Sequence, residues 1–431
     1  MSNLQPIRVG ILGFGVVGTG LYQVLTENAD SIIQRVGRPV TVKRIADVDW
    51  DRPRDVTVPD ELKTTDAYEI INDPEINIVA ETIGGLEPAM KFVMDAIAAG
   101  KSVVTSNKEM IARHGHDILA AAAANSVDVQ FEGAVGGVVP IIRTLKESLD
   151  ADHIYEIMGI VNGTTNYILT EMSREGLDFQ VALGQAQQLG YAEADPTDDV
   201  EGIDAANKLA ILSAIAFGRR VDVDQIYREG ISQLLPEDIA YAHRMGYVVK
   251  LLAIARRRDD DSVETHVHPV LLSQKHPLAS VSGPFNAIFV RGRACDEVML
   301  YGRGAGSLPT GSAVAGDVID SARNLTKNAA GRVPCVCAGQ AEIVPMGEVS
   351  SRVYVRMKVK DQPGVMGAIS TIFGSQSISI ACVMQEDTDG QTADIVWIMH
   401  ECGEDQLTGA LAAIQALPIV EAIPARIRVE G

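Results

Sequence analysis

Apolar and polar positions follow three successive patterns along the chain, and the first covers residues 7 to about 137. Short runs rich in Val and Ile alternate there with longer amphipathic segments, one of which spans residues 109–125. The apolar runs are IRVGIL, TVKRIADV, INIVAET, KSVVTS and VDVQFEG. Continuously apolar strands that alternate with helices predict an α/β fold, in which a parallel sheet carries helices on both faces.

The second pattern, from about residue 140 to 303, mixes helices with strands of alternating polarity. A helix is predicted over 200–217 and a strand over SVETHVHPVLL, so this part is an α+β unit. The charge run at 256–261 is interpreted as a solvated hairpin turn. His266 and His268 share one face of the strand that follows; a metal pair is one interpretation, and exposed strand histidines are the favoured one.

The third pattern covers the last eighty or so residues. Its segments RVYVRMKV, VMGAISTIFGS, ISIACVMQE, TADIVWIMH, EDQLTGALAAIQAL and IPARIRV read strand, helix, strand, strand, helix, strand. This order predicts a ferredoxin-like βαββαβ module over 351–431. The Gly, Pro and Ser content of 331–350 indicates a linker before it.

Length and composition narrow the classes of protein. A chain of 431 residues is expected to form two or three domains. Its net charge of −20 disfavours nucleic acid or an anionic membrane as partner, because little here would neutralise phosphates. The sequence contains no apolar run long enough to predict a membrane span, and its first residues do not resemble a signal peptide. Five sparse cysteines without CxxC spacing indicate a reducing, cytoplasmic setting.

A glycine-rich loop lies between the first predicted strand and the helix after it. In Gly13-Phe14-Gly15-Val16-Val17-Gly18 the first glycine permits a tight turn, and the second lets the backbone approach a pyrophosphate. The third allows close packing of strand and helix, whose N-terminus faces the anion. In this strand–loop–helix context the motif predicts a Rossmann-type dinucleotide site.

The choice between NAD and NADP stays open at this stage. Asp47 ends the second predicted strand, where an acid would bind the ribose hydroxyls of NAD, but it lies 29 residues after Gly18, further than the usual distance of about 20. Asp49 follows closely. Three basic residues near enough in sequence to accept a 2′-phosphate are Lys43, Arg44 and Arg52.

Polar residues at two other strand ends are candidates for chemistry, because ligands of doubly wound sheets bind beyond the carboxyl ends of the strands. These stretches are 81–85 and 105–108, and the second ends in Lys108. Hydride transfer to a carbonyl leaves an alkoxide that must be protonated. None of the eight histidines has a recognisable catalytic context, so lysines are the better candidates.

Two further loops allow a binding or a structural interpretation. The small residues of FEGAVGGVVP, 131–140, suit oxygen ligands around a hard cation and suit an interdomain hinge equally well. Asn162-Gly163-Thr164-Thr165-Asn166 lies between a strand and a helix, where amides and hydroxyls would bind a small carboxylate. Helix capping alone would need only one of these residues.

The predicted helix at 200–217 carries a polar stripe of Glu201, Asp204 and Lys208 among apolar residues. The stripe is interpreted either as a weak ion pair on a wet face or as a proton-exchanging lysine that Asp204 fixes. The second interpretation is favoured because a nicotinamide site needs a proton partner.

Taken in order, the motifs resemble the longer, ACT-bearing members of the homoserine dehydrogenase family over essentially the whole chain. They are GFGVVG, TSNK, FEGAVGGVVP, NGTTNYIL, GYAEADPTDDVEGIDAANKLAIL and YGRGAGSLPTGSAVAGD. NGTTNYIL and the GYAEADP block are the most specific. The resemblance implies a reversible, NAD(P)-dependent interconversion of L-homoserine and L-aspartate 4-semialdehyde, in the route to threonine, isoleucine and methionine.

The resemblance also implies roles for individual residues. Lys208 would be the proton donor in the reducing direction, Lys108 would lie beside the nicotinamide with a possible share in proton transfer, and Asp204 would assist. Glu193 would bind the substrate ammonium group. The remaining substrate residues would be Gly190, Asp199, Asp204, Asn162, Gly163 and Thr164. The coenzyme residues would be Gly13, Phe14, Gly15, Val16, Val17, Gly18, Asp47, Thr82, Lys108, Gly304 and Gly306.

The same resemblance implies a cation site, a domain plan and partners. A monovalent cation such as Na⁺ would be held by Glu132 and the backbone of Val135, Gly137 and Val139. The coenzyme domain would cover 1–138 plus about 305–330, and a substrate and dimerisation domain 139–304. The C-terminal module would be an ACT domain that binds an amino-acid effector, with L-threonine as the natural hypothesis. A homodimer or homotetramer is expected.

Two other functions stay open on the sequence. A dehydrogenase of the same architecture that acts on a sugar or an imino acid would need its own substrate motif. A non-catalytic amino-acid sensor would have no use for Lys108, Asp204 and Lys208.

Overall fold

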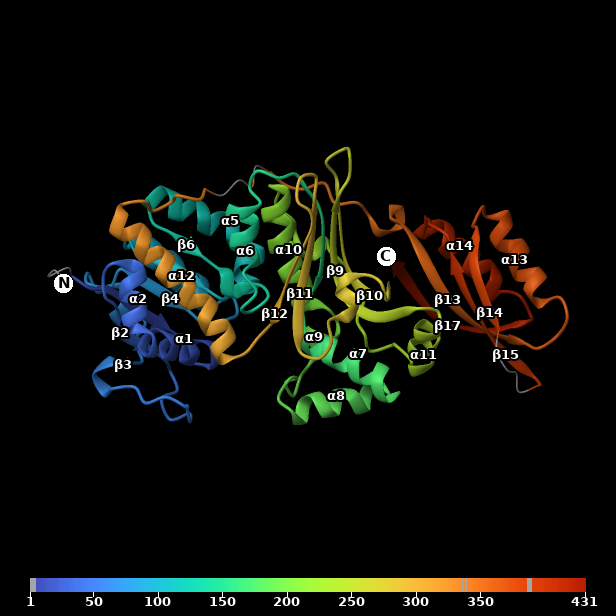
Figure 1. Cartoon of the computed structure of the whole chain (residues 1–431), viewed down its shortest axis with the longest axis horizontal. Helices are drawn as coiled ribbons and strands as arrows, with labels where there is room; N and C mark the ends of the chain where they lie inside the picture. Colours follow the sequence, from blue (N-terminus) through green and yellow to red (C-terminus); the bar gives the residue numbers. More distant parts are fainter. Residues whose placement is uncertain (1–4, 335–336, 338, 386–389) are drawn as a thin grey trace. The chain divides into compact units, whose positions relative to one another are not determined.

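The computed structural model describes residues 5–334, 337, 339–385 and 390–431. Its contacts divide the chain into two compact units. Unit 1 contains residues 1–157, 207–225 and 286–341, and unit 2 contains 158–206, 226–285 and 342–431. Figure 1 labels the elements of both. Among the described residues, no helix has the length and apolar character that crossing a bilayer requires.

Unit 1 is built on a six-stranded sheet in the order β3-β2-β1-β4-β5-β6, with every neighbouring pair parallel. Its strands are β1 (Ile7–Leu12), β2 (Val40–Ala46), β3 (Lys63–Thr64), β4 (Ile78–Glu81), β5 (Ser102–Thr105) and β6 (Val129–Gln130). The strand order reverses direction at β1, which lies between β2 and β4. The prediction of a parallel, doubly wound sheet is confirmed.

The helices of unit 1 form two groups around this sheet. One group is α1 (Val16–Glu27), α2 (Ala29–Val36) and α12 (Ser307–Lys327), and α12 crosses α1 closely. The other is α3 (Tyr68–Ile71), α4 (Ala89–Ala98) and α5 (Lys108–Asn125). The first group and the strands bury one apolar cluster that includes Phe14, Leu21 and Val314. The helix at the end of the middle segment therefore completes the N-terminal fold, as Figure 1 shows for α12.

Unit 1 also contains the short helix α6 (Ile141–Arg143), the hairpin strands β11 (Phe285–Gly292) and β12 (Asp296–Arg303), and most of α10 (Ile203–Phe217). Helix α10 passes from unit 2 to unit 1 between Ala206 and Asn207. Strand β7 (Ile154–Ile160) begins in unit 1 and ends in unit 2.

The sheet of unit 2 continues from β7 in the order β9-β10-β17-β13-β15-β14. Its other strands are β8 (Tyr227–Arg228), β9 (Tyr247–Arg257), β10 (Val263–Ser273), β13 (Ser350–Lys360), β14 (Ile380–Gln385), β15 (Thr392–Met399), β16 (Cys402–Gly403) and β17 (Val420–Glu430). Its helices are α7 (Gly163–Glu175), α8 (Phe179–Gln188), α9 (Thr197–Val200), α11 (Pro236–Arg244), α13 (Val365–Ser375) and α14 (Glu404–Gln415).

The C-terminal module has the predicted βαββαβ order, and it is joined to the middle segment by more than its linker. Strand β17 pairs parallel with β10, from Val270 opposite Arg428 to Leu272 opposite Glu430. Alternate residues of β13 face helices α13 and α14, where Val355 and Met357 join a core with Phe373 and Trp397. The ACT-type sheet is thus an extension of the β9-β10 sheet.

The structure corrects two expectations for the middle segment. The helix expected at 200–217 begins at Ile203, because Gly202, with φ of 76°, separates it from α9. Glu201 is therefore not on the stripe of Asp204 and Lys208, and it accepts a hydrogen bond from Ser232 Oγ. His266 and His268 are not exposed: they are buried and stacked, because β10 is an interior strand.

The structure offers no support for a metal at the two histidines. Nε2 of His268 lies 2.9 Å from Nδ1 of His266, and no group of three or more His, Cys, Asp or Glu in the described part of the chain could hold a metal ion. The described cysteines, Cys295, Cys337, Cys382 and Cys402, are free, and Cys335 lies outside the described residues.

Candidate active site

The glycine-rich loop after β1 has the geometry that a pyrophosphate requires. Gly13 has φ of 89°, and a Cβ there would lie 2.8 Å from the backbone of Thr82 and Ile83. A Cβ on Gly18 would lie 2.2 Å from the carbonyl oxygen of Gly13, so this glycine allows strand and helix to pack. Gly15 is different: its Cβ position is open, and no side chain caps α1. The first and third glycines build the turn, and the second leaves room for an anion at the helix N-terminus.

Residues that follow two other strands hold this loop. Thr82 Oγ1, after β4, donates to the carbonyl oxygen of Gly13 at 2.6 Å. Asp47, after β2, accepts the Phe14 N–H at Oδ2, at 2.5 Å. Phe14 itself is fully buried and packs its ring against Tyr22 and Trp50. The Phe14 ring, which was expected among the coenzyme residues, is therefore part of the core of unit 1.

Glu81 organises the adjacent loop and was only loosely indicated by the sequence. Its buried carboxylate accepts hydrogen bonds from the N–H groups of Ile83 and Gly84, at 2.7 and 3.1 Å, and from the Thr105 hydroxyl. Burial raises the pKa of Glu81, against the lowering effect of these donors. An acid in the otherwise apolar run INIVAET was the signal that could have identified it.

Lys108 begins α5 directly after this network. Asn107 caps the helix by accepting the Met110 N–H at Oδ1, and its Nδ2 donates to the carbonyl oxygen of Gly85 at 2.6 Å. Asn107 thereby ties the start of α5 to the loop after β4. Lys108 is half-buried at the carboxyl edge of the sheet, as the sequence predicted.

The loop expected to hold a cation contains two glycines in the left-handed conformation, Gly136 (φ 73°) and Gly137 (φ 59°). The Glu132 carboxylate accepts the N–H groups of Ile142 and Arg143, at 2.8 and 2.9 Å, so the side chain caps α6. The Gly136 carbonyl accepts the Val139 N–H. Both oxygens of the Glu132 carboxylate are thus engaged by the backbone at the start of α6.

Asp317 of α12 fixes this loop and was missed by the sequence interpretation. Its fully buried Oδ2 accepts the Glu132 N–H at 2.8 Å, and Oδ1 lies 3.3 Å from Arg143 Nη2. Burial, together with the nearby Glu132 charge, raises the pKa of Asp317 to about 8. No local pattern indicated the residue, because its partners lie about 180 residues earlier.

The last expected coenzyme residues return beside the same loop. A Cβ on Gly137 would meet the carbonyl group of Gly304 at 2.5 Å, and the Val138 N–H donates to the carbonyl of Arg303. Gly306, with φ of 129°, precedes α12. The structure thus brings the strand–helix turn at 304–306 next to the predicted cation loop.

In unit 2, Asn162 gathers the acids expected to bind substrate. Its Oδ1 caps α7 by accepting the Thr165 N–H at 2.9 Å. Its Nδ2 donates to Asp199 Oδ1 at 2.6 Å and to Asp204 Oδ2 at 2.9 Å. Asn162 therefore caps the helix, as one of the two interpretations of this loop expected, and the same side chain joins Asp199 to Asp204.

The other expected substrate residues border this cluster or lie outside it. A Cβ on Gly163 would lie 2.9 Å from the carbonyl oxygen of Pro284, and Thr164 Oγ1 donates to the carbonyl of Tyr191. Gly190 has φ of 74° and ends the turn after α8. Glu193 is exposed on the loop that follows.

Asp204 and Lys208 lie one turn apart on α10 and are both buried, at 4% and 9% exposure. The interpretation as an ion pair on a wet face is therefore wrong. Asn162 also joins Asp204 to Asp199. A buried lysine one turn from such an acid is typical of a proton-transfer group and the residue that orients it.

Comparisons with known proteins cover nearly the entire chain. Two family models match, "Homoserine dehydrogenase, NAD binding domain" over residues 13–132 and "Homoserine dehydrogenase" over 140–319. A third, "ACT domain", matches 353–419. The homoserine dehydrogenase of Corynebacterium glutamicum is 43% identical, over 99% of this chain and 96% of its own length.

The chain belongs to the homoserine dehydrogenase family. A crystal structure of a homoserine dehydrogenase from Thiobacillus denitrificans superposes with a TM-score of 0.92 at 45% identity, covering 99% of this chain and 98% of that one. A hyperthermophilic archaeal homoserine dehydrogenase solved with NADPH has a TM-score of 0.61 at 29% identity and covers 74% of this chain and 98% of that one. Members of this family are oxidoreductases that depend on NAD(P).

Proposed function

We propose that the chain interconverts L-aspartate 4-semialdehyde and L-homoserine, with Lys208 as the group that moves the proton. One observation carries the proposal: α10 presents Asp204, joined to Asn162 in the acid cluster, and one turn later a buried lysine. We expect a substrate bound at Asp204 to meet the ammonium group that the same helix carries one turn later. The reaction would serve the synthesis of threonine, isoleucine and methionine.

Each step assigns a task to a residue of this chain. A bound nicotinamide supplies or accepts the hydride at the substrate carbon. In the reducing direction Lys208 Nζ donates a proton to the developing alkoxide, and in the oxidising direction it removes the alcohol proton. Asp204 orients Lys208, and Lys108, at the start of α5, is the second lysine that could share the proton.

The substrate's own charges find matching groups in unit 2. The start of α7, around Gly163 and Thr164, suits the carboxylate, because a helix N-terminus attracts an anion. Glu193 suits the ammonium group, with Asp199 and the turn at Gly190 in support. The coenzyme would lie on the loop at 13–18 with Thr82, Gly304 and Gly306 around it.

The proposed organisation follows the sequence plan. Residues 1–138 and about 305–330 would bind the coenzyme, residues 139–304 would bind substrate, and 331–350 would link them to the regulatory module at 351–431. A monovalent cation would be held by Glu132, Val135, Gly137 and Val139, chiefly through carbonyl oxygens, and would stiffen the loop that precedes α6. The sparse cysteines support a cytoplasmic location.

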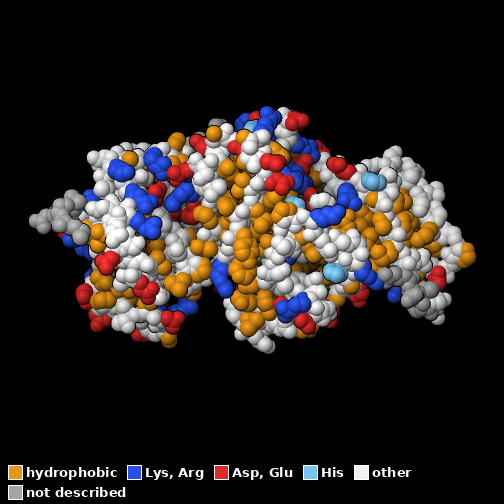
Figure 2. All heavy atoms as spheres, in the orientation of Figure 1, with side chains coloured by type: hydrophobic (Ala, Val, Ile, Leu, Met, Phe, Trp, Pro, Cys, Tyr) orange, Lys and Arg blue, Asp and Glu red, His pale blue; other side chains and the backbone are white. Residues whose placement is uncertain are grey.

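A homodimer or homotetramer is proposed through the middle strands. Strand β12 ends its sheet, and its Met299 and Tyr301 side chains are 38% and 54% exposed. Figure 2 shows hydrophobic side chains gathered where Figure 1 places β11 and β12. An apolar patch on a sheet edge is typical of a contact between copies.

The deciding experiment follows the absorbance of reduced coenzyme with semialdehyde or homoserine for the wild type and Lys208→Ala. We expect kcat to fall by about 100-fold or more, the scale of losing a general acid. Lys108→Ala, measured alongside, tells which lysine delivers the proton. Lys327→Ala is the matched control, since that exposed lysine ends α12. Near-normal turnover in Lys208→Ala would remove Lys208 from the mechanism.

A further inference from the structure

We infer that Asp47 and the loop it anchors select NAD over NADP. The inference rests on the proposed function only in that it concerns the same coenzyme site. It follows from how Asp47 is held and from what the surrounding basic side chains already bind, neither of which the sequence revealed.

The Asp47 carboxylate is fixed at the phosphate loop. Oδ2 accepts the Phe14 N–H at 2.5 Å, and Oδ1 accepts the Asp49 N–H at 2.8 Å. In a Rossmann-type fold the acid at the end of the second strand meets the ribose hydroxyls of the adenosine. Two backbone donors keep this carboxylate beside the turn at Gly13–Gly15, although it lies further along the chain than is usual. Each oxygen keeps a lone pair that a ribose hydroxyl could use.

Arg54 forms an ion pair with Asp47, and each of its three side-chain nitrogens donates a hydrogen bond to a backbone carbonyl. Nε donates to the carbonyl of Phe14 at 2.9 Å, Nη1 to the carbonyl of Arg52 at 3.0 Å, and Nη2 to the carbonyl of Asp49 at 2.5 Å. Nη2 also lies 3.4 Å from Asp47 Oδ1, and the side chain is only 9% exposed.

Stacking holds the Arg54 guanidinium in this place. Its central carbon lies 5.4 Å from the ring centre of Phe14 and 5.2 Å from that of Trp50. Cation–π contacts of a shielded arginine add to its hydrogen bonds. To bind a 2′-phosphate, the Arg54 guanidinium would have to give up hydrogen bonds that it already makes to backbone carbonyls. Arg54 therefore braces the loop, and the ribose meets Asp47.

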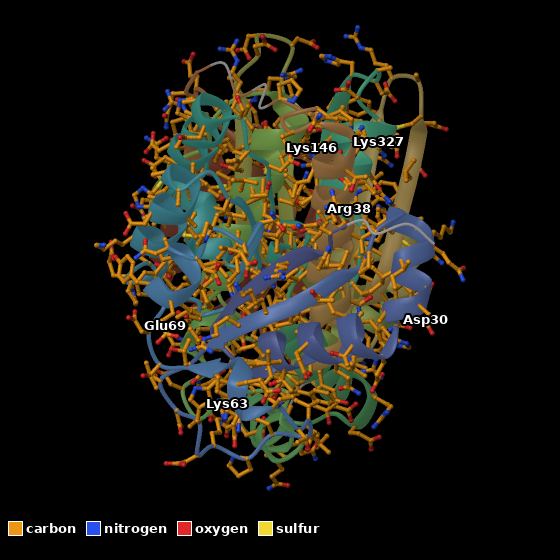
Figure 3. The ribbon with its side chains drawn as sticks, turned by 90° about the vertical axis from the view of Figure 1, so that its left-hand side faces the viewer. Asp30, Arg38, Lys63, Glu69, Lys146 and Lys327 are labelled. Carbon is orange, nitrogen blue, oxygen red and sulfur yellow. The ribbon has the colours of Figure 1, made fainter. Side chains whose placement is uncertain are left out.

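Two of the three basic residues expected near a 2′-phosphate are engaged elsewhere. Lys43 Nζ donates to Asp73 and Glu75, each at 2.5 Å. Arg44 pairs with Glu69, and its Nη1 donates to the carbonyl of Glu61 at 2.7 Å. In Figure 3, Glu69 lies towards Lys63 at the lower left, away from Asp30 at the right.

The remaining basic residue, Arg52, is an exposed side chain among acids. The stretch 47–55 contains four aspartates and two arginines, one of which is the occupied Arg54. A phosphate with about two negative charges would meet this net negative loop, whereas a neutral hydroxyl would donate to Asp47. Discrimination of this kind acts by repelling the wrong ligand as well as by binding the right one.

The test measures equilibrium binding of NADH and NADPH to the full chain without substrate, by the fluorescence of the reduced nicotinamide. We expect NADH to bind at least about 10-fold more tightly. Asp47→Ser should weaken NADH binding and strengthen NADPH binding. The ratio of the affinity for NADH to the affinity for NADPH should then fall by about 10-fold or more. Asp51→Ser is the matched control, because Asp51 is an exposed acid of the same loop, and its ratio should change much less.

A second variant decides the place of Arg52. Arg52→Ala should leave NADPH binding nearly unchanged; a large loss confined to NADPH would mean that Arg52 holds the 2′-phosphate and would overturn the inference. Equal or tighter binding of NADPH by the wild type overturns it directly. Selective NADH binding without turnover of the semialdehyde would contradict the proposed function and leave the coenzyme preference standing. Binding of neither coenzyme would contradict both.

Discussion

Lys250 of β9 shows how a single buried side chain can make stability depend on pH. Its Nζ donates to the carbonyl of Val281 at 2.5 Å and to Asn166 Oδ1 at 3.2 Å. Asn166 in turn donates to the carbonyls of Gly283 and Phe285. The lysine thus ties the helix that follows Asn162 to the segment at 281–285. Burial lowers the pKa of Lys250 from 10.5 to about 8.

The sign of the pH effect follows from this pKa. Between about pH 8 and 10.5 the unfolded chain holds a proton on Lys250 that the folded chain has lost, so the free energy of unfolding rises with pH. The shift in the Lys250 pKa corresponds to about 3 kcal/mol of unfolding free energy. Below pH 8 the folded chain carries the whole of this destabilisation, because Lys250 is then charged and buried. Urea unfolding of the wild type should show this rise, and Lys250→Met should lack it.

Exposed Lys327→Met is the control for Lys250, and it should follow the wild type. Parallel pH curves for the wild type and Lys250→Met would show that the Lys250 ammonium is not desolvated. The same two variants also test whether Lys250 positions the proposed substrate loop. Lys250→Met should raise KM more than it lowers kcat, because the segment that Lys250 holds borders that loop.

At the scale of elements, the crossing of α1 and α12 depends on two glycines. A Cβ on Gly20 would lie 2.0 Å from the carbonyl oxygen of Ser307, and a Cβ on Gly311 would lie 2.5 Å from the carbonyl carbon of Gly20. The neighbouring atoms are backbone, so only separation of the helices could relieve the overlap. Helix α1 also begins at the glycine-rich loop proposed to bind the coenzyme, so this crossing would position that loop.

Gly311→Ala should therefore lower the free energy of unfolding by about 1–3 kcal/mol, the usual cost of overpacking, despite the better helix propensity of alanine. It should also weaken coenzyme binding, because α1 must shift. Gly316→Ala is the matched control: it lies on the same helix with open space at its Cβ position. That variant should stabilise the chain by up to about 1 kcal/mol. A stabilised Gly311→Ala would contradict the close crossing.

At the scale of the whole molecule, a buried ion pair and its hydrogen bonds connect the ACT-type module to helix α11, and both belong to unit 2. Asp238 of α11 accepts hydrogen bonds from Tyr354 Oη at 2.8 Å and from Arg356 Nε and Nη2 at 2.7 and 2.9 Å. Arg428 of β17 bridges Glu404 and Glu229 in the same manner. The module therefore contacts the middle segment through these ion pairs as well as through the pairing of β17 with β10.

Millimolar L-threonine should lower the turnover of the wild type if the module binds this amino acid and the connection transmits it. Arg356→Lys should keep most of the basal activity but weaken the response, because lysine cannot make the bidentate contact with Asp238. Steady-state rates over a threonine titration check both statements, with Lys327→Ala as a control. An unchanged wild-type rate would exclude threonine as the effector, and an equal response in both proteins would exclude this route.

The sequence by itself determined the features that local patterns encode. Strand and helix periods predicted the parallel sheet and the βαββαβ order, and the strand–loop–helix context identified the glycine motif. The boundaries of β1 and α13 agree with IRVGIL and VMGAISTIFGS. These properties depend on side chains a few residues apart, so one chain suffices to predict them.

The tertiary structure decided what lies opposite each residue. Strand β10, which carries the buried His266 and His268, pairs in parallel with β17 from about 160 residues later in the chain. The Glu132 N–H donates to Asp317, 185 residues further on. No periodicity specifies a partner more than a hundred residues away, because burial of a polar group depends on which element covers it.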